Sequence, residues 1–543
     1  MQPPPSPRAE FAPLGAAARR SAAAAVPRLA TGVTAFVGRA LRGPVNEATL
    51  VGSFAEFQQR FGGLWQPAPM GYALEQYFEQ GGRDAIIVRV ANGGRSPSLA
   101  LPAGRGSLPL RGCAPGTREY LRASVDYDGV PAGDELQFNL VLQRLRAPES
   151  ELIDDQEIHR LVTVQADSPR CVTQALKHSR LMRVAGPLPA LRPDRTGLQG
   201  KALVSYVAAH ADGTDGEPLS DYDLIGDREA GTGLFALLAG PRFDLLCLPP
   251  PAREQDLGPT ALLVAARICR ASQALLVVDP PSTWETPEAA LSLMPGWPFR
   301  SEDALMAFPR LLGQDRLRGR AESFAPCGAV AGLLARASGT GGYWGEPGLL
   351  RAGLRPRCEV EPQARAQLAR LGINTFDVVR PRPGEAPAWR TLVAEGTGSG
   401  FARELTSRRF ALWLQACVLE GTRWLLQEAA APDTFTRART QVDEFLAGLA
   451  AEGRLASSQP GEGYYVICDQ RLHGEQVLES GGRRLLFAFA LQRPGEFQCC
   501  LVSHEPGGSS VRTVAVNQLA EPGSHRALQF GTALLRQLEG PGA

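Results

Sequence analysis

Residues 406–455 read TSRRFALWLQACVLEGTRWLLQEAAAPDTFTRARTQVDEFLAGLAAEGRL, and residues 464–469 read YYVICD. Apolar residues recur at roughly helical spacing in two parts of this stretch, and its end is a short apolar run typical of a strand. We therefore expect two long amphipathic helices followed by a strand. No group of residues in the stretch could carry out chemistry, which favours an assembly component over a catalyst.

The expected helices have recognisable apolar faces and ends. The apolar positions are Phe410, Trp413, Cys417, Trp424 and Leu425 in the first helix, and Phe435, Val442, Phe445 and Leu449 in the second. We expect Asp433 to be the N-cap of the second helix and Gly453 to end it, because these residue types are favoured at helix termini.

Length and charge exclude several classes of protein. A chain of 543 residues is too long for one core, so three or four domains are expected. The 57 Lys and Arg residues nearly balance the 56 Asp and Glu residues, so non-specific nucleic-acid binding is not expected. Since no apolar run reaches about 18 residues, we expect no membrane insertion. The proline-rich start reads as a flexible tail, and the protein as soluble and cytoplasmic when made.

Metal and cofactor sites are not predicted. Ten cysteines are scattered without a CxxC pair, and the six histidines show no HxxxH or HExxH spacing. The adjacent Cys499 and Cys500 lie in an apolar run, where strand geometry would point them to opposite faces. Buried free thiols and ordinary surface or core histidines are the expected interpretation.

The N-terminal region reads as a β–β–α–α–β unit. Strands are expected at TAFVG and ATLVGS, and Ser53 with Glu56 predicts a capping box for a helix that ends at Gly62. A second helix should stop at Gly81–Gly82, and the apolar run at residues 84–90 predicts a buried strand.

The expected fold class is α/β (mixed α+β) and multidomain, with a β-rich domain inserted into a discontinuous core. The expected parts are a flexible arm (1–30), the first core segment (31–95), the β-rich insertion (96–197), an α/β domain (198–395), a C-terminal domain with the two long helices (396–515) and an extension (516–543). Within the α/β domain, FDLLCLP, ALLVAARICRAS and ALLVVDPP predict a β–α–β unit with parallel strands.

One carboxylate and two glycine-rich loops are candidates for chemistry. Asp279 ends a strand, where α/β enzymes often place a functional acid, but the two prolines that follow favour a turn-forming role. The loops GTGGYWG (339–345) and GTGSG (396–400) lack the Walker and Rossmann patterns and are interpreted as flexible loops. An α/β enzyme that uses Asp279 and a glycine loop remains an alternative.

Motifs in one consistent order resemble the contractile tail sheath family of phages, R-type pyocins and extracellular contractile injection systems. They include GVTAFVGRALRGPVNEATLVGSFAEFQQRFGG, YFEQGGRDAIIVRV, ADSPRCVTQALKHSRLMRV, DGTDGEPLSDYDLIGDREAGTGLFAL, PCGAVAGLLAR, LGINTFDVVRP and SRRFALWLQACVLEGTRWLLQE. The resemblance is spread over most of the chain.

The resemblance implies a non-enzymatic structural subunit. Such subunits stack as six-membered rings in a helix around an inner tube, associate with baseplate and tail-terminator proteins, and contract to drive the tube through a target envelope. It implies assembly in the bacterial cytoplasm, followed by residence in a virion tail or a released particle. The family exchanges terminal strands between neighbours, a form of β-augmentation. Residues 1–30 lack a convincing strand pattern and the C-terminus extends to Ala543, so exchange by these arms stays open.

The inner-tube contact should be modest and polar, because it must break on contraction. The candidate is the solvent face of the second long helix, with Arg437, Arg439, Asp443 and Glu444, and a merely solvated helix face is the alternative. A scaffold or end-capping component built on the same fold is a further alternative to the ordinary sheath subunit.

Overall fold

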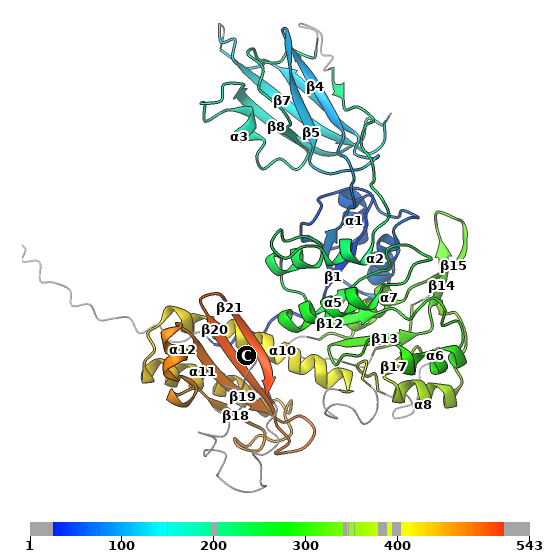
Figure 1. Cartoon of the computed structure of the whole chain (residues 1–543), viewed down its shortest axis with the longest axis vertical. Coiled ribbons are helices and arrows are strands. Elements are labelled where there is room, and N and C mark those ends of the chain that lie inside the picture. Colours follow the sequence, from blue (N-terminus) through cyan, green and yellow to red (C-terminus); the bar gives the residue numbers. More distant parts are fainter. Residues whose placement is uncertain are drawn as a thin grey trace, which may run out of the picture. The chain divides into compact units, whose positions relative to one another are not determined.

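The computed structural model describes residues 25–131, 133–148, 150–197, 205–339, 345, 347–351, 353–377, 388–393 and 403–514 (Figure 1). The chain divides into two compact units. The core unit is Arg28–Ala416, and the C-terminal unit contains the described residues 25–27 and 417–514.

Several expected features lie outside the described residues. They are residues 1–24 of the N-terminal arm, most of the loop at 339–345, the loop at 396–400 and the extension at 516–543. Among the described residues, no helix is both long enough and apolar enough to cross a membrane.

A seven-stranded sheet forms the centre of the core unit, in the order β17-β13-β12-β11-β1-β3-β2. Strand β1 pairs in parallel with both β3 and β11, and only β2 is antiparallel to its neighbour. The strands are β1 (Val33–Gly38), β2 (Thr49–Val51), β3 (Asp84–Arg89), β11 (Leu245–Cys247), β12 (Leu275–Val278), β13 (Ala304–Phe308) and β17 (Ile373–Thr375). The predicted β–α–β unit with parallel strands is confirmed.

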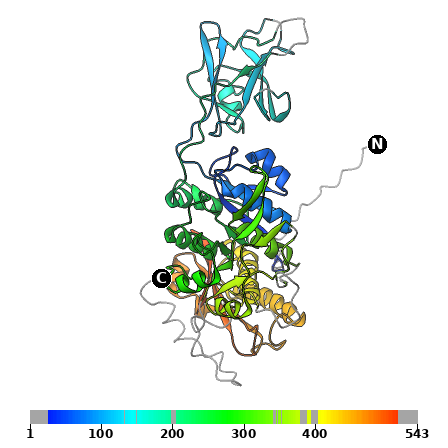
Figure 2. The same ribbon diagram turned by 90° about the vertical axis from the view of Figure 1, so that its right-hand side faces the viewer.

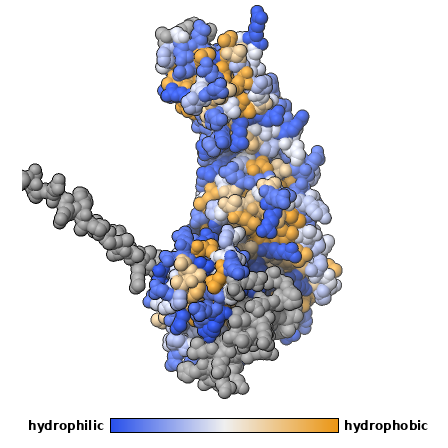
Figure 3. Space-filling view, turned by 60° about the vertical axis from the view of Figure 1, so that its left-hand side comes forward, coloured by the Kyte–Doolittle hydropathy of each residue, from blue (hydrophilic) through white to orange (hydrophobic). Residues whose placement is uncertain are grey.

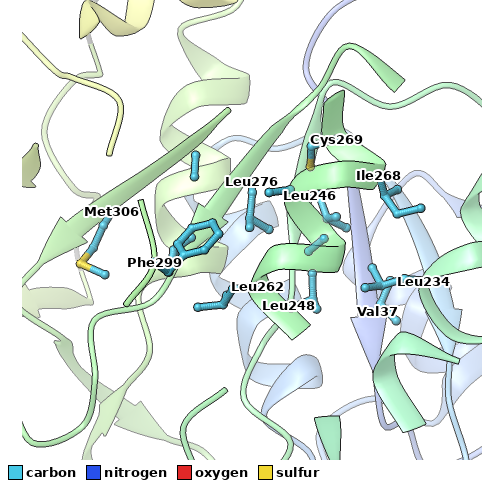
Figure 4. Close-up of a cluster of buried hydrophobic side chains, with 14 of the residues drawn as sticks. Val37, Leu234, Leu246, Leu248, Leu262, Ile268, Cys269, Leu276, Phe299 and Met306 are labelled. Atoms are coloured by element: carbon cyan, nitrogen blue, oxygen red, sulfur yellow. The ribbon is translucent and has the colours of Figure 1, made fainter. Parts of the chain in front are cut away.

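Helices cover both faces of this sheet, which explains why its strands read as continuous apolar runs. Val37 faces one layer, where Leu262 and Ile268 lie over Leu246 and Leu276 of the sheet (Figure 4). That layer contains α4 (Asp221–Ile225), η1 (Gly233–Ala239), α5 (Pro259–Ser272), α6 (Pro287–Leu293), η2 (Met294–Gly296) and α8 (Pro362–Arg370). Phe36 faces the other layer, with α1 (Phe54–Phe61), α2 (Pro69–Gln80) and α7 (Cys327–Arg336). The predicted α/β fold class is confirmed.

The local signals at the start of the chain are confirmed with one correction. The order is β1, β2, α1, α2, β3, as expected. The Ser53 hydroxyl accepts the N–H of Glu56, and Gly62 ends α1 at a φ of 91°. The Glu56 carboxylate, however, accepts the N–H of Gly52 at 2.8 Å and not that of Ser53. The reciprocal half of the predicted capping box is therefore shifted by one residue.

Glycines of α7 allow α2 to lie unusually close. A Cβ atom at Gly328 would lie 2.0 Å from the carbonyl oxygen of Ala73, and one at Gly332 would lie 2.5 Å from that of Tyr77. Any side chain at Gly328 would push the two helices apart, because real contacts of this kind do not fall below 3 Å.

The β-rich insertion consists of two antiparallel sheets with an apolar core between them. One sheet has the order β10-β6-β7-β8 and the other β4-β5-β9. The chain enters and leaves through two adjacent segments, with bridges between Asn92 and Glu217 and between Arg95 and Thr214 (Figures 1 and 2). The elements are β4 (Ser98–Ala103), β5 (Gly106–Gly112), β6 (Leu121–Asp126), β7 (Gln137–Leu145), β8 (Ile153–Thr163), α3 (Val172–Ala175), β9 (Met182–Val184) and β10 (Val207–Ala208). Strand β10 lies beyond residue 197, and the predicted domain boundaries stay predictions.

Buried arginines attach the insertion to the sheet. Arg89, at the end of β3, is buried and donates to the carbonyl oxygens of Ala40, Gly43 and Pro115. Burial lowers the pKa of Arg89 to about 10, so it remains a cation at neutral pH. Arg42 pairs with Asp154 at 2.6 Å, and both side chains are nearly inaccessible to solvent.

Outside the insertion, four of the described strands of the core unit were not predicted from the sequence. Besides β13, they are β14 (Leu311–Asp315), β15 (Arg320–Phe324) and β16 (Leu354–Pro356), which form a small antiparallel sheet in the order β15-β14-β16. These segments are three to five residues long, which is too brief for either a continuous apolar run or an alternating pattern to identify a strand.

The C-terminal unit combines helices with a four-stranded antiparallel sheet in the order β18-β19-β20-β21. Its elements are the end of α10 (Leu405–Gly421), η3 (Arg423–Gln427), α11 (Pro432–Ala451), β18 (Tyr464–Ile467), η4 (Gln470–Leu472), α12 (Glu475–Glu479), β19 (Arg483–Phe489), β20 (Gln498–Glu505) and β21 (Gly508–Val514). Cys499 and Cys500 are both buried on successive positions of β20, as expected.

The two long helices are confirmed, but their ends differ from the prediction. The first ends at Gly421, so Trp424 and Leu425 lie in the 3-10 helix η3. The N-cap of α11 is Ala431, and Asp433 lies in the first turn. Proline at the first helical position explains the shift, since its fixed φ and missing N–H suit that position. Gly453 follows the helix at a φ of 71°.

Candidate functional site

Two consecutive arginines fix the start of α10 on the core unit. Arg408 pairs with Asp303, a fully buried carboxylate that also accepts from Arg270 at 2.9 Å. The neighbouring Arg409 donates to the carbonyl oxygen of Leu334 at 3.3 Å and to the hydroxyl of Ser338 at 2.9 Å. Isolated buried charges are costly, so paired arginines act mainly to specify position.

A second buried carboxylate links Arg409 to the first strand. Asp244 lies within 4.0 Å of Arg409 and accepts the backbone N–H groups of Gly32 and Val33 at 2.9 and 2.8 Å. Burial lowers the pKa of Arg409 to about 10 and raises that of Asp244, which Arg409 partly offsets. The helix, β1 and the start of β11 are therefore held by one charge cluster.

The four predicted tube-contact residues do not share one face of α11. At 100° per residue, Arg437 and Glu444 lie together on one flank of the exposed arc, and Arg439 and Asp443 lie about 130° away on the other. Arg439 and Glu444 are exposed, while Arg437 and Asp443 are half-buried. The solvent ridge between the two flanks carries the small residues Thr436, Thr440 and Ala447.

Arg437 has a structural role within the C-terminal unit. Its guanidinium carbon lies 4.8 Å from the ring centroid of Trp424, and its Nη2 lies 3.4 Å from Glu428 Oε1. Stacking on tryptophan favours a fixed guanidinium. Burial raises the pKa of Asp443, and Arg439 opposes that shift. Arg439, Asp443 and Glu444 therefore remain as the members of the predicted set that could meet a partner.

Asp279 organises the start of α7. Its Oδ1 accepts the backbone N–H of Cys327 at 2.7 Å, a favourable place for a carboxylate because the helix N-terminus carries a partial positive charge. Its Oδ2 is buried, with no partner among the described residues. Burial raises the pKa of Asp279 to about 6.

The space beside Asp279 is too small for a substrate. Asp279 lines a cavity of about 30 Å³ together with Asp256, Arg310 and Trp297. That volume holds a water molecule, whereas ligand sites are typically ~300 Å³ or larger. In the described part of the chain, no cluster of His, Cys, Asp and Glu could hold a metal ion.

The place where α/β sheets usually bind ligands also lacks a phosphate-binding loop. Strand order reverses between β1 and β11, and ligands of such sheets bind beyond the carboxyl ends of the strands at that point. Pro249, Pro250 and Pro251 follow β11 there, so the turn has no glycines and no N–H groups to bind an anion.

Sequence reasoning missed the residues with the most specific contacts. The pair Arg408–Arg409 was part of a quoted motif, but its partners lie about a hundred or more residues earlier at Asp303 and Asp244. His473 and His504, interpreted from sequence as ordinary histidines, are buried and hydrogen-bonded through both ring nitrogens. The one sequence signal that could have indicated these contacts is the pair of adjacent arginines at the start of a mainly apolar helix.

Solved structures with this fold are sheath proteins. The sheath tail protein Lin1278 from Listeria innocua is 12% identical and matches with a TM-score of 0.56, over 89% of this chain and 94% of that protein. The sheath of PVC, an extracellular contractile injection system, in its contracted state is 14% identical and matches with a TM-score of 0.50, over 92% and 97% of the two chains. No family model and no curated protein matches the sequence.

The chain therefore has the contractile tail sheath fold over nearly its whole described length. The fold predicted from the motif order is confirmed. The two similar structures are a sheath tail protein and the sheath of an injection system. At sequence identities of 12% and 14%, this similarity establishes the fold alone.

The role of Asp279 can be tested by removing its charge. In the unfolded chain an aspartate titrates near pH 3.9, so the folded protein binds more protons between about pH 4 and 6 and loses stability as the pH rises through that window. The variant Asp279→Asn keeps an acceptor for Cys327 but does not titrate. As the pH rises from 4 to 7.5, the free energy of unfolding of this variant should increase by roughly 2–3 kcal/mol relative to that of the native protein.

The measurement is thermal unfolding of both proteins at the two pH values. Asp256→Asn, a nearby and more exposed carboxylate, is the matched control and should show a smaller pH dependence. An equal stability difference between native and Asp279→Asn at pH 4 and pH 7.5 would contradict the structural role.

Proposed function

We propose that this chain is a structural subunit of a contractile sheath, which polymerises around an inner tube and contracts to drive that tube through a target envelope. The observation that carries the proposal is the sheath fold along about nine-tenths of the chain. It is also supported by the structural use of Asp279, the carboxylate on which the enzyme alternative depends.

The proposed partners follow from that role. Copies of the chain form six-membered rings that stack helically, and the stack associates with a baseplate and a tail terminator. The assembled sheath belongs to a virion tail or a released particle, and assembly takes place in the bacterial cytoplasm. The two similar proteins are described as sheath components of a tail and of an injection system, which supports these partners.

Exposed apolar side chains supply surface for contacts between copies. Leu263 of α5 and Tyr222 of α4 are more than half exposed, as is Ile158 of the edge strand β8. On the face shown in Figure 3, hydrophobic residues are interspersed with hydrophilic ones. Interfaces that must slide or break suit such mixed surfaces, because dry apolar contacts would be too permanent.

Electron microscopy of the purified chain, alone and co-expressed with its tube and baseplate partners, tests the proposal. A sheath subunit should give rings or tubes in negative stain. Discrete monomers with turnover would support the enzyme alternative, and attachment only at particle ends would support the end-capping alternative. A version lacking residues 1–24 keeps the buried Val26 and shows whether the arm is needed: unchanged full-length tubes would make it dispensable.

The tube contact is proposed for the flank of α11 that carries Arg439 and Asp443. Glu444 lies on the other flank, and its reversal tests whether that side takes part. Arg439→Glu should reduce co-sedimentation of the tube several-fold, because opposite charges steer and align such contacts, while leaving the melting temperature within about 1 °C. Arg493→Glu is the matched control: it is an exposed arginine of the same unit outside α11. Tube attachment unchanged by reversal at Arg439, Asp443 and Glu444 would reduce the site to a solvated helix face.

A further inference from the structure

Two histidines are buried in the C-terminal unit, and the proposed function uses neither. His504 of β20 is fully buried and His473, just after η4, is 5% exposed. Histidine is the side chain whose charge changes most readily near neutral pH, so a buried pair with every ring nitrogen bonded is a candidate switch.

The hydrogen bonds of His504 are satisfied by a neutral ring. The Thr422 hydroxyl donates its only proton to the carbonyl oxygen of Val418 at 2.7 Å, so it accepts from His504 Nε2 at 2.8 Å. The remaining nitrogen, Nδ1, then accepts from the Ser509 hydroxyl at 2.8 Å. A second proton on this ring would oblige the Ser509 hydroxyl to turn and accept, and it would place a charge on a buried side chain.

His473 is held neutral in the opposite tautomer. Its Nε2 accepts the backbone N–H of Arg484 at 3.0 Å, and its Nδ1 donates to the carbonyl oxygen of Asp469 at 2.7 Å. The ring stacks on Phe435 of α11, with centroids 4.0 Å apart. Protonation at Nε2 would place two N–H groups against each other.

Both rings meet the start of β19. His504 is the cross-strand partner of Arg483, and His473 accepts from the next residue, Arg484. Through Thr422 and Phe435, the rings connect this strand and β20 to the segment after α10 and to α11.

The charges around the rings are mostly cationic. Arg423 faces His504, while Arg483 and Arg484 face His473. The nearby acids are engaged: Glu420 pairs with Arg423, and Asp469 pairs with Arg471. Asp469 favours a charged His473, but the two arginines of β19 and burial oppose it.

We propose that His473 and His504 form an acid-sensitive latch, which holds the strands β19–β21 against α11 and the last turn of α10 while both rings are neutral and releases them when the rings take up protons. The latch residues are His473, His504 and their partners Thr422, Ser509, Asp469 and Arg484. The inference concerns the stability of this unit alone and does not depend on the sheath role.

The direction of the effect follows from linkage. Burial, with Arg423 beside it, lowers the pKa of His504 to about 4, and burial lowers the pKa of His473. A released histidine titrates near 6.5, so the latch is fully stabilising above that pH and weakens as the pH falls toward 4. From pH 8 to pH 5, His504 alone should raise the population of the open state about 30-fold.

Hydrogen–deuterium exchange of the full chain measures the opening directly. The Arg484 amide is itself bonded to His473, so the peptide that contains it reports on the latch. After correction for intrinsic exchange, protection of residues 483–489 and 498–514 should fall about 30-fold or more between pH 8 and pH 5. Protection of β1 and β3 in the core unit should change far less.

The variant His473→Gln/His504→Gln, which cannot titrate, should remove most of this pH dependence. The matched control is His178→Gln/His210→Gln, two exposed histidines of the core unit, which should behave as the native protein does. Equal pH dependence in the first variant and the native chain would overturn the proposal. If that variant does not fold, the pKa values of the histidines are measured in the native chain from the pH dependence of their ¹³Cε1 chemical shifts. His473 and His504 should both have pKa values well below 6.5. Values near 6.5 for both would overturn the proposal.

Discussion

The fold depends on β1 lying between β3 and β11. This six-residue strand pairs in parallel with a neighbour about fifty residues later and with another about two hundred residues later. The chain between those two neighbours leaves the carboxyl end of β3 and must return to the amino end of β11, at the opposite edge of the sheet. The bridges Asn92–Glu217 and Arg95–Thr214 bring the two ends of the insertion together, so the insertion adds little to the distance that this crossover must span. A parallel pairing of distant segments carries a large loop-closure cost, which the fully buried apolar faces of the strands offset.

Buried charged side chains then fix the relative positions of helices and strands that apolar packing alone does not specify. Arg89 ties the end of β3 to the insertion, and Asp244 joins the start of β1 to Arg409 of α10. Such groups contribute little net stability, since desolvation cancels most of the attraction, but a wrong arrangement would leave a charge unpaired. The same logic applies to His473 and His504 in the C-terminal unit, with the difference that these side chains become charged when the pH falls.

The sequence predicted what local rules determine. Helix starts and stops at Ser53, Gly62 and Gly81, the parallel β–α–β unit and the continuous apolar strands were all recognisable. The predicted N-cap of α11 was wrong by two residues, because Pro432 starts the helix and places Asp433 in its first turn. Contacts between distant residues were not accessible: the pairs Arg408–Asp303 and Arg42–Asp154 join positions 105 and 112 residues apart. The candidate tube-contact residues could be predicted only in part. Helical periodicity shows which residues of α11 are exposed, but it does not show that the Arg437 guanidinium stacks on Trp424.

The most direct test of this architecture is amide hydrogen exchange of the native chain at neutral pH. If β1 closes one sheet from two distant segments, the amides of residues 33–38, 84–89 and 245–247 should exchange together, through one cooperative opening, and be among the slowest in the core unit. Exchange of β1 and β3 as a separate unit, faster than β11 and β12 by tenfold or more, would contradict the account. That result would mean that the N-terminal segment is only loosely attached to the rest of the sheet.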